Sequence, residues 1–262
     1  MVNSKQFRLK INLLFFLVCL PLLLSNLTAC VRNSTQNSRL ADFPPVILWA
    51  WEQEANLDFL DAKKYGVAFL AQTLEMKNDE ILINPRRQQL RVKPEIALIA
   101  VTRIEPLESP TLSDKQKNEI ISLILKTLDL KNVRAVQIDF DAALSQRDFY
   151  QSLLKDLRAQ LPEKTPLSIT ALASFCIGDR WLFEAPVDEA VPMIFRMGAD
   201  DRAVKNYLAN GGDFKVEICR QSYGVSLDEA VQMSFNKSRR IYVFNPLQWK
   251  PADMAKIEEN FK

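Results

Sequence analysis

Eight short runs of β-branched and aromatic residues recur along the chain from residue 46 onward. Each run is bounded by glycine, proline or charged residues, which is the pattern of a buried strand. The predicted strands cover residues 46–52, 66–76, 95–105, 135–142, 167–174, 191–198, 214–220 and 240–249. So many strands in one chain require a large sheet or a closed barrel.

Helical patterns occupy four of the gaps between these runs. Ser113 and Gln116 form a capping box ahead of residues 117–128, and Pro162 stops a helix over 146–161. A third pattern, 200–212, ends on a glycine pair, and Ser226 with Glu229 predicts a capping box for a helix over 226–235. The segments after the first two strands are shorter and less regular, so they do not predict helices.

Alternating strands and helices predict a parallel sheet with right-handed crossovers. Closure into an α/β, TIM-type (β/α)8 barrel is the simplest arrangement, in a single domain over residues 44–262. An open doubly wound sheet is the alternative. No glycine-rich phosphate loop follows any strand, which argues against a nucleotide-binding Rossmann domain and gives no reason to expect a cofactor.

The first 29 residues read as an export signal. Three basic residues precede an apolar run over 11–24 that is too short for a permanent transmembrane helix. The following "LTAC" resembles the bacterial lipobox, which implies that Cys30 is lipidated and that residues 30–43 form a flexible tether. An ordinary signal or a membrane anchor is the alternative. By resemblance to the enterobacterial sorting rule, the absence of Asp after Cys30 predicts the periplasmic face of the outer membrane.

Histidine is absent from the chain. Catalytic triads and histidine-ligated metal sites are therefore excluded, and acid–base chemistry would have to use Asp, Glu, Lys, Tyr or Cys. Cys176 and Cys219 are the two cysteines of the domain. Export to an oxidising compartment favours a disulfide between them, with two buried free thiols as the alternative. Without histidine, they make a poor zinc site.

Removal of residues 1–29 takes away three basic residues and no acidic ones, so the net charge falls from +2 to −1. No stripe of lysine and arginine with interleaved aromatic residues remains. Nucleic acid is therefore not expected as a partner.

The fourth predicted strand carries two aspartates. Val136, Ile138 and Phe140 alternate with Gln137, Asp139 and Asp141, so the two sets occupy opposite faces. The apolar set is expected to face the helices and the polar set the barrel interior. Asp139 and Asp141 then lie nearest the C-terminal mouth, where barrel enzymes have their sites. Two carboxyls so close should not both ionise easily.

Polar and aromatic residues near the ends of other strands could join them at the mouth. The candidates for binding a substrate are Gln137, Glu52, Glu75, Arg196, Trp181 and Trp249; Arg103 with Glu105, Glu217 with Arg220, and Asn245 with Gln248 occupy similar positions. Carboxylates among tryptophans suit a polyol ligand. The alternative is a structural cluster of ion pairs, with Trp49 and Trp51 simply packing outward.

The stretch "VQIDFDAALSQRDFYQSLLKDLRAQLP", with residues 167–182 and 189–198, resembles an uncharacterised family of bacterial exported barrel proteins. "IDFDAA" is more distantly similar to the Asp-x-x-Asp-x-Asp-x-Glu pattern of chitinase-type glycoside hydrolases. Asp139 and Asp141 match its second and third aspartates, whereas Val136 replaces the first and Ala143 replaces the catalytic glutamate.

Three hypotheses follow. The first is an envelope glycoside-hydrolase-like barrel, with Asp141 as acid or base, Asp139 orienting it, and Glu52, Glu75 or Glu217 able to serve as a second carboxyl. The second is a barrel that binds glycan or an envelope protein without catalysis, which Ala143 favours. The third is a divalent cation held by Asp139, Asp141 and a neighbouring glutamate.

Overall fold

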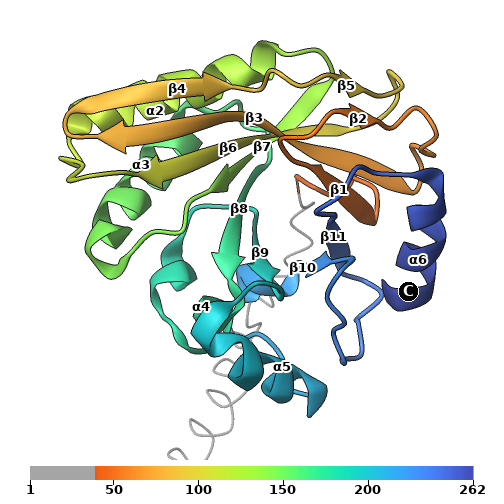
Figure 1. Ribbon diagram of the computed structural model, residues 1–262. Helices are drawn as coiled ribbons and strands as arrows, with labels where there is room; N and C mark the ends of the chain where they lie inside the picture. Colours follow the sequence, from red (N-terminus) through yellow and green to blue (C-terminus); the bar gives the residue numbers. More distant parts are fainter. Residues whose placement is uncertain (1–38, 262) are drawn as a thin grey trace, which may run out of the picture. The chain divides into compact units, whose positions relative to one another are not determined.

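Eight parallel strands pair side by side into a closed ring in this computed structural model (Figure 1). The strands follow one another around the ring in chain order. The first strand pairs with both the second and the last, and this closes the ring. They are β1 (Val46–Ala50), β3 (Tyr65–Lys77), β6 (Leu98–Pro106), β7 (Val133–Asp139), β8 (Leu167–Leu172), β9 (Glu189–Met193), β10 (Ser222–Ser226) and β11 (Arg240–Phe244). The expected TIM-type barrel is confirmed, and the open doubly wound sheet is wrong.

Three of the predicted helices form, with the termini that the sequence indicates. Ser113 and Gln116 make the reciprocal hydrogen bonds of a capping box at the start of the first, the second ends just before Pro162, and Gly211 follows the third with a φ of +83°. The α-helices are α2 (Asp114–Lys126), α3 (Arg147–Gln160), α4 (Ala173–Gly178), α5 (Asp201–Ala209) and α6 (Pro251–Phe261). Neither α4 nor α6 was predicted; α4 begins at Ala173, where the strand expected over 167–174 already ends at Leu172.

The seventh predicted strand, 214–220, is wrong. The barrel strand is β10, whereas Glu217–Arg220 forms a 3-10 turn, η5. Phe214, Val216 and Cys219 supply the apolar character of the predicted run, and they are buried in the main hydrophobic cluster. The true strand reads "SYGVS", which has weak intrinsic strand propensity, so pairing with β9 and β11 decides its structure.

The helix predicted over 226–235 is also wrong. Ser226 ends β10, and its hydroxyl donates a hydrogen bond to the Asp228 carboxylate. The Glu229 carboxylate accepts the backbone N–H of Arg196 at 3.1 Å and pairs with Lys205 at 3.1 Å. The local Ser226–Asp228 bond and the tertiary contacts of Glu229 replace the capping box that the spacing had indicated.

The first two connections of the barrel contain strands in place of helices. Within residues 39–261, the chain between β1 and β3 carries the two-residue strand β2 (Ala55–Asn56) and no α-helix. After β3 it returns as β4 (Glu80–Pro85), antiparallel to β3, and then as β5 (Leu90–Arg91), which pairs with β2. The irregular sequence of these two segments had indicated the lack of helices.

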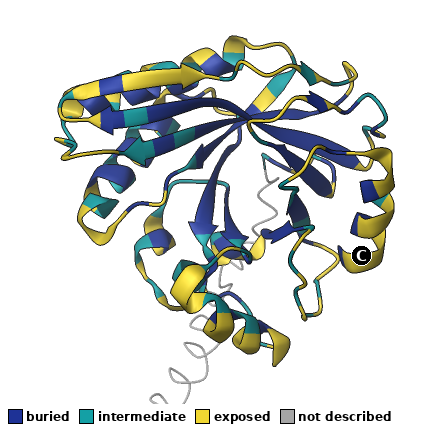
Figure 2. Ribbon diagram, viewed as in Figure 1, coloured by how far each residue is buried: buried dark blue, intermediate teal, exposed yellow. Residues whose placement is uncertain are grey.

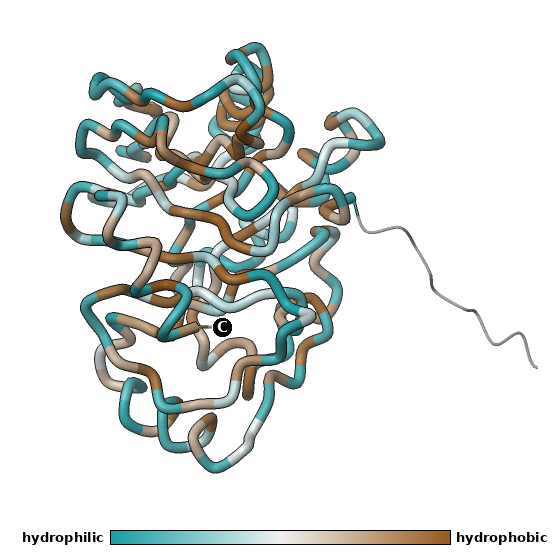
Figure 3. The backbone as a smooth tube through the Cα atoms, turned by 90° about the vertical axis from the view of Figure 1, so that its right-hand side faces the viewer, coloured by the Kyte–Doolittle hydropathy of each residue, from teal (hydrophilic) through white to brown (hydrophobic). Residues whose placement is uncertain are grey.

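Two apolar layers stabilise the barrel. Figure 2 shows the barrel strands largely buried, while β4 and the outer faces of the surrounding helices are exposed. The larger cluster lies between strands and helices and includes Val136, Ile138 and Phe140, as the alternation predicts. A smaller cluster fills the barrel interior, with Ile47, Trp49 and Tyr242 among its members. In Figure 3 the hydrophobic segments correspondingly alternate with hydrophilic loops.

The structure describes residues 39–261; the predicted signal over 1–29 and Cys30 lie outside them. Residues 39–43, assigned above to the tether, already contact the barrel. Leu40 is buried, its carbonyl accepts a 2.7 Å hydrogen bond from Arg240, and Arg39 pairs with Asp188 at 2.7 Å. Among the described residues, no helix is both long and apolar enough to cross a membrane.

Candidate functional site

A pocket of about 240 Å³ opens at the C-terminal ends of the barrel strands. Six of the eight strands contribute to this mouth pocket, either from their last residues or from the residues that follow. Its lining consists of Trp49, Trp51, Arg103, Asp139, Asp141, Thr170, Leu172, Met193, Phe195, Arg196 and Phe244. The structure therefore brings both predicted aspartates to the expected end of the barrel.

Four aromatic side chains form one wall of the mouth pocket. Phe195 and Phe244 stack with ring centroids 5.5 Å apart, and Trp51 meets Phe244 edge-on at 6.5 Å. Trp49 lies 6.1 Å from Phe195. The suggestion that Trp49 and Trp51 pack outward is wrong, because both belong to the interior layer.

Trp49 is fixed from below by a buried polar layer. Its indole Nε1 donates to Gln137 at 2.8 Å, and the Gln137 amide donates to Ser168 at 2.9 Å. Gly224 makes room for the ring, since a Cβ there would lie 3.1 Å from the indole edge. Gln137 therefore points inward, as predicted, but it is fully buried beneath the mouth pocket and supports the site without lining it.

Asp139 is the last residue of β7, and its carboxylate faces both Thr170 and Arg103. The Thr170 hydroxyl donates to Oδ1 at 2.6 Å, while Arg103 Nε lies 4.0 Å from Oδ2. Burial raises the pKa of Asp139 to about 6, and the negative charge of Asp141 adds to the rise. The Thr170 hydrogen bond and the Arg103 charge oppose it. Asp139 is thus a carboxyl that exchanges its proton near neutral pH.

Asp141 follows β7 in a tight turn, because the strand ends at Asp139 and not at residue 142 as predicted. Asp141 is exposed at the rim of the mouth pocket. Desolvation by the surrounding protein nevertheless raises the pKa of its carboxyl, while the positive charge of Arg103 acts to lower it. Tyr150 lies behind the pair, with its ring 4.9 Å from that of Phe140. Its hydroxyl is buried without a hydrogen-bond partner, and burial and both aspartates raise its pKa.

The solved structures that are similar to this chain include two from spore proteins. The Bacillus cereus spore cortex-lytic enzyme SleL shares 17% identity over 76% of this chain and 54% of its own, with a TM-score of 0.46. The chitinase domain of the Clostridium difficile spore coat protein CotE shares 13% identity over 79% of this chain and 66% of its own, with a TM-score of 0.43. The likeness is distant.

This chain spans about half the length of SleL. At these identities and scores the likeness concerns the fold alone. No family model and no curated protein matches the sequence. The resemblance to an uncharacterised exported family and the more distant one to chitinase-type glycoside hydrolases therefore both stay predictions.

The other predicted binding residues are divided between the mouth pocket and other parts of the structure. Arg196 lines the mouth pocket, where its guanidinium lies 4.9 Å from the Phe244 ring centroid and pairs with Asp228 at 3.1 Å. Glu52 lines a neighbouring hollow, and Trp249 is buried beside it, donating to the Trp49 carbonyl at 2.9 Å.

The structure places three further candidates away from the mouth pocket. Glu75 accepts a hydrogen bond from Asn84 across the β3–β4 hairpin. Trp181 packs against Tyr150 and Phe175, and Glu217 is exposed on the η5 turn. Neither Glu75 nor Trp181 lines the mouth pocket with the aspartates: Glu75 lies on the part of β3 that pairs with β4, and Trp181 lies in the 3-10 turn after α4.

Cys176 and Cys219 form the predicted disulfide, with Cα atoms 5.9 Å apart. It joins α4 to the η5 turn, so it braces the connections outside the barrel. In the described part of the chain, no three His, Cys, Asp or Glu side chains are grouped as a metal site, so Asp139 and Asp141 lack the third ligand that the cation hypothesis needs.

Sequence reasoning missed Thr170, Leu172, Met193, Phe195 and Phe244. The alternation of side chains along the strands indicated most of them. Ser168, Thr170 and Leu172 share one face of β8, and Val191, Met193 and Phe195 share one face along and just beyond β9. Reading both faces of each strand in register with Asp139 would have found them. The complete lining of the mouth pocket provides two carboxyls, two guanidinium groups and an aromatic wall, which can hold a hydroxyl-rich ring and exchange a proton with it.

Proposed function

We propose that this protein binds glycans in the bacterial cell envelope and that the sugar occupies the mouth pocket. The observation that carries the proposal is the meeting of Asp139 and Asp141 with four aromatic side chains in one pocket. Carboxylate oxygens accept strong hydrogen bonds from hydroxyl groups, and aromatic rings offer flat apolar surface to the C–H faces of a pyranose.

The size of the mouth pocket agrees with a single sugar ring. Its volume of about 240 Å³ is below the range of roughly 300–1,000 Å³ that is usual for drug-sized ligands. Arg103 and Arg196 flank the carboxylates and add donors for ring or hydroxyl oxygens.

Calorimetric titration with peptidoglycan fragments and N-acetylglucosamine oligomers tests the proposal. Asp141→Asn and Trp51→Ala should each weaken binding at least about tenfold, the cost of one good polar or stacking contact. Asp129→Asn, an exposed carboxyl remote from the mouth, is the matched control and should bind as wild type does. No binding by any of these glycans, or binding that both mouth variants leave unchanged, contradicts the proposal.

Hydrolysis of the bound glycan is the second candidate function, favoured by the pKa of about 6 for Asp139. A general acid works best when its pKa lies near the operating pH. Asp139 would protonate the glycosidic oxygen as its bond to the anomeric carbon breaks, and ionised Asp141 would stabilise the positive charge left on the sugar. Water would then add to the anomeric carbon and return a proton to Asp139. Against this, both carboxyls come from one strand end, and Glu52, Glu75 and Glu217 do not line the mouth pocket.

Release of reducing ends from the same glycans, measured across pH, separates the two functions. Hydrolysis predicts activity in wild type that declines as pH rises through about 6 and disappears in Asp139→Asn. Binding without release of reducing ends in both proteins identifies a non-catalytic barrel.

The proposed cellular location follows from the N-terminal sequence. Cys30 would carry lipid and hold the barrel at the periplasmic face of the outer membrane. Wild type should incorporate labelled palmitate and fractionate with outer membranes, whereas Cys30→Ser should do neither. A wild-type protein that stays unlabelled would remove the lipid anchor from the proposal.

A further inference from the structure

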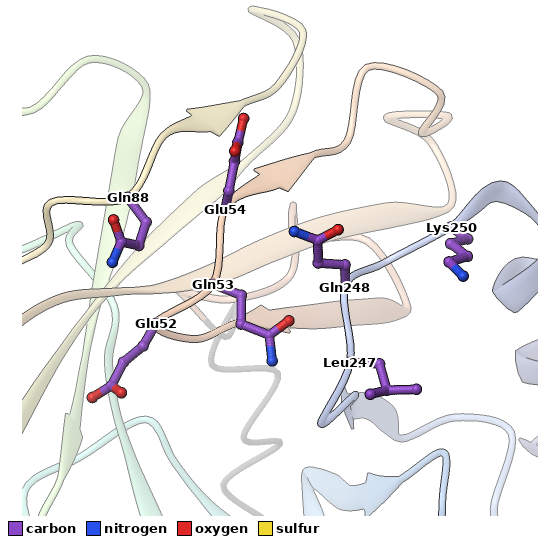
Figure 4. A pocket seen from close by; sticks show the side chains of 7 residues that line it. All are labelled: Glu52, Gln53, Glu54, Gln88, Leu247, Gln248 and Lys250. Atoms are coloured by element: carbon purple, nitrogen blue, oxygen red, sulfur yellow. The ribbon is translucent and has the colours of Figure 1, made fainter.

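A second hollow, with a volume of about 600 Å³, lies beside the mouth pocket between the segments that follow β1 and β11. Figure 4 shows lining side chains arising from these two segments, and Gln88 arising from the segment between β4 and β5. The first segment contributes Glu52, Gln53 and Glu54, and the second contributes Leu247, Gln248 and Lys250. We call this the outer hollow.

The outer hollow and the mouth pocket each share lining residues with a third cavity. A small cavity of about 140 Å³ lies between them. It shares Trp49, Trp51 and Phe244 with the mouth pocket, and Glu52 and Gln248 with the outer hollow. The path from Asp139 to Gln248 therefore runs past Trp51.

The first wall of the outer hollow is held in place by Arg86. This side chain reaches across from the segment after β4 and donates to the carbonyls of Ala50, Trp51 and Gln53, the last at 2.5 Å. It is half-buried, and these charge-assisted bonds fix the backbone that carries Glu52.

The second wall is tied to the first and braced from behind. The Gln53 amide donates to the Pro246 carbonyl at 2.7 Å, which links the two segments directly. The Asp253 carboxylate accepts the backbone N–H of Lys250 at 2.9 Å and the Asn245 amide at 3.3 Å. Because both walls are already held, a ligand would lose little free energy in ordering them.

The lining chemistry selects a class of ligand. Glutamine amides both donate and accept hydrogen bonds, which suits hydroxyl and acetamido groups. Leu247 is 71% exposed and offers apolar contact beside them. Glu52 and Glu54 outnumber Lys250, so the outer hollow disfavours an anionic chain.

We infer that the outer hollow binds the sugar units that follow the one in the mouth pocket, so that the ligand is a linear, uncharged oligosaccharide. This rests on the proposed function, because the mouth pocket must hold the first unit. Affinity then depends on chain length, and Gln248 and Glu52 act only on ligands long enough to reach them.

Titration with N-acetylglucosamine and its linear oligomers tests the inference. Wild type should bind the longer oligomers at least about tenfold more tightly than the monosaccharide. Gln248→Ala and Glu52→Gln should remove most of that gain and leave monosaccharide binding unchanged. Neither side chain makes a hydrogen bond or ion pair within residues 39–261, so both variants should fold. Gln160→Ala, an exposed glutamine on α3, is the matched control.

The outcomes separate this inference from the proposed function. Equal affinity for all lengths, or an unchanged gain in both variants, overturns the outer hollow as a binding site while the mouth pocket stands. Tighter binding of an acidic oligosaccharide of the same length overturns the assignment to an uncharged chain. Absence of binding at every length overturns both proposals.

Discussion

Asp139 is a carboxyl whose ionisation works against the fold. Its pKa rises from the ordinary 3.8 to about 6, so the folded protein binds its proton more tightly than the unfolded chain does. Between those pH values the folded state carries more protons, and stability therefore falls as pH rises. Above about pH 6 the ionised Asp139 lowers the free energy of unfolding by its full amount, on the order of 3 kcal/mol for a pKa shift of this size.

Asp139→Asn should therefore stabilise the protein at pH 7.5 and flatten its stability between pH 4 and 6. Urea unfolding of wild type and variant at several pH values measures both effects. The exposed Asp129→Asn variant controls for loss of a negative charge and should leave the slope unchanged. A slope in Asp139→Asn equal to that of wild type would mean that Asp139 titrates normally.

The strands β1, β7 and β8 are joined inside the barrel by side-chain hydrogen bonds as well as by their backbones. Gln137 on β7 accepts a hydrogen bond from the indole N–H of Trp49 on β1 and donates one to the Ser168 hydroxyl on β8. All three residues are almost completely buried. Such a layer holds the register that sets Trp49 at the base of the mouth pocket, since a shifted strand would leave buried donors unpaired.

Gln137→Ala should destabilise the barrel by about 2–4 kcal/mol, because it leaves a cavity and an unpaired indole N–H. Its near-ultraviolet circular dichroism should also change, since Trp49 loses its fixed partner. The exposed Gln160→Ala variant should differ from wild type by no more than about 0.5 kcal/mol in the same urea titration. A loss below about 1 kcal/mol in Gln137→Ala would show that the layer contributes little.

The barrel as a unit is stabilised by closure and by one covalent link. The disulfide between Cys176 and Cys219 spans 43 residues and joins the connection after β8 to the one before β10. A link of this span stabilises by constraining the unfolded chain, typically by about 2–4 kcal/mol.

Replacement of both cysteines by alanine should lower the thermal midpoint, and reduction of wild type should lower it comparably. Differential scanning calorimetry with and without reductant measures this, and the double variant should no longer respond to reductant. An unchanged midpoint in reduced wild type, with free thiols verified by labelling, would exclude a stabilising role for the disulfide.

Much of the architecture could be predicted because it depends on local periodicity. Seven strands, three helix ends and the parity of β7 follow from spacing along the chain, and the cysteine pairing follows from the expected export to an oxidising compartment. The exceptions have tertiary causes. β10 forms from a weak strand sequence because β9 and β11 flank it, and Glu229 bonds to Arg196 instead of capping a helix.

The candidate site was only partly predictable for a related reason. In β7 the inner face carries polar residues, so alternation placed Asp139 at the mouth. In β1 both faces are apolar and buried, so nothing local indicated that Trp49 faces the interior. Glu75 and Trp181 looked equivalent to Arg196 in sequence, but Glu75 lies on the part of β3 that pairs with β4, and the connection after β8 carries Trp181 away from the mouth pocket.

By itself, therefore, the sequence determined a parallel barrel, the inward face of the aspartate-bearing strand and the class of chemistry that a chain without histidine can perform. Tertiary structure alone decided which aromatic and basic side chains surround those aspartates and that a second hollow lies beside them. The physical reason is that periodicity fixes the face a residue occupies on its own strand. The register between strands and the course of the loops fix its neighbours.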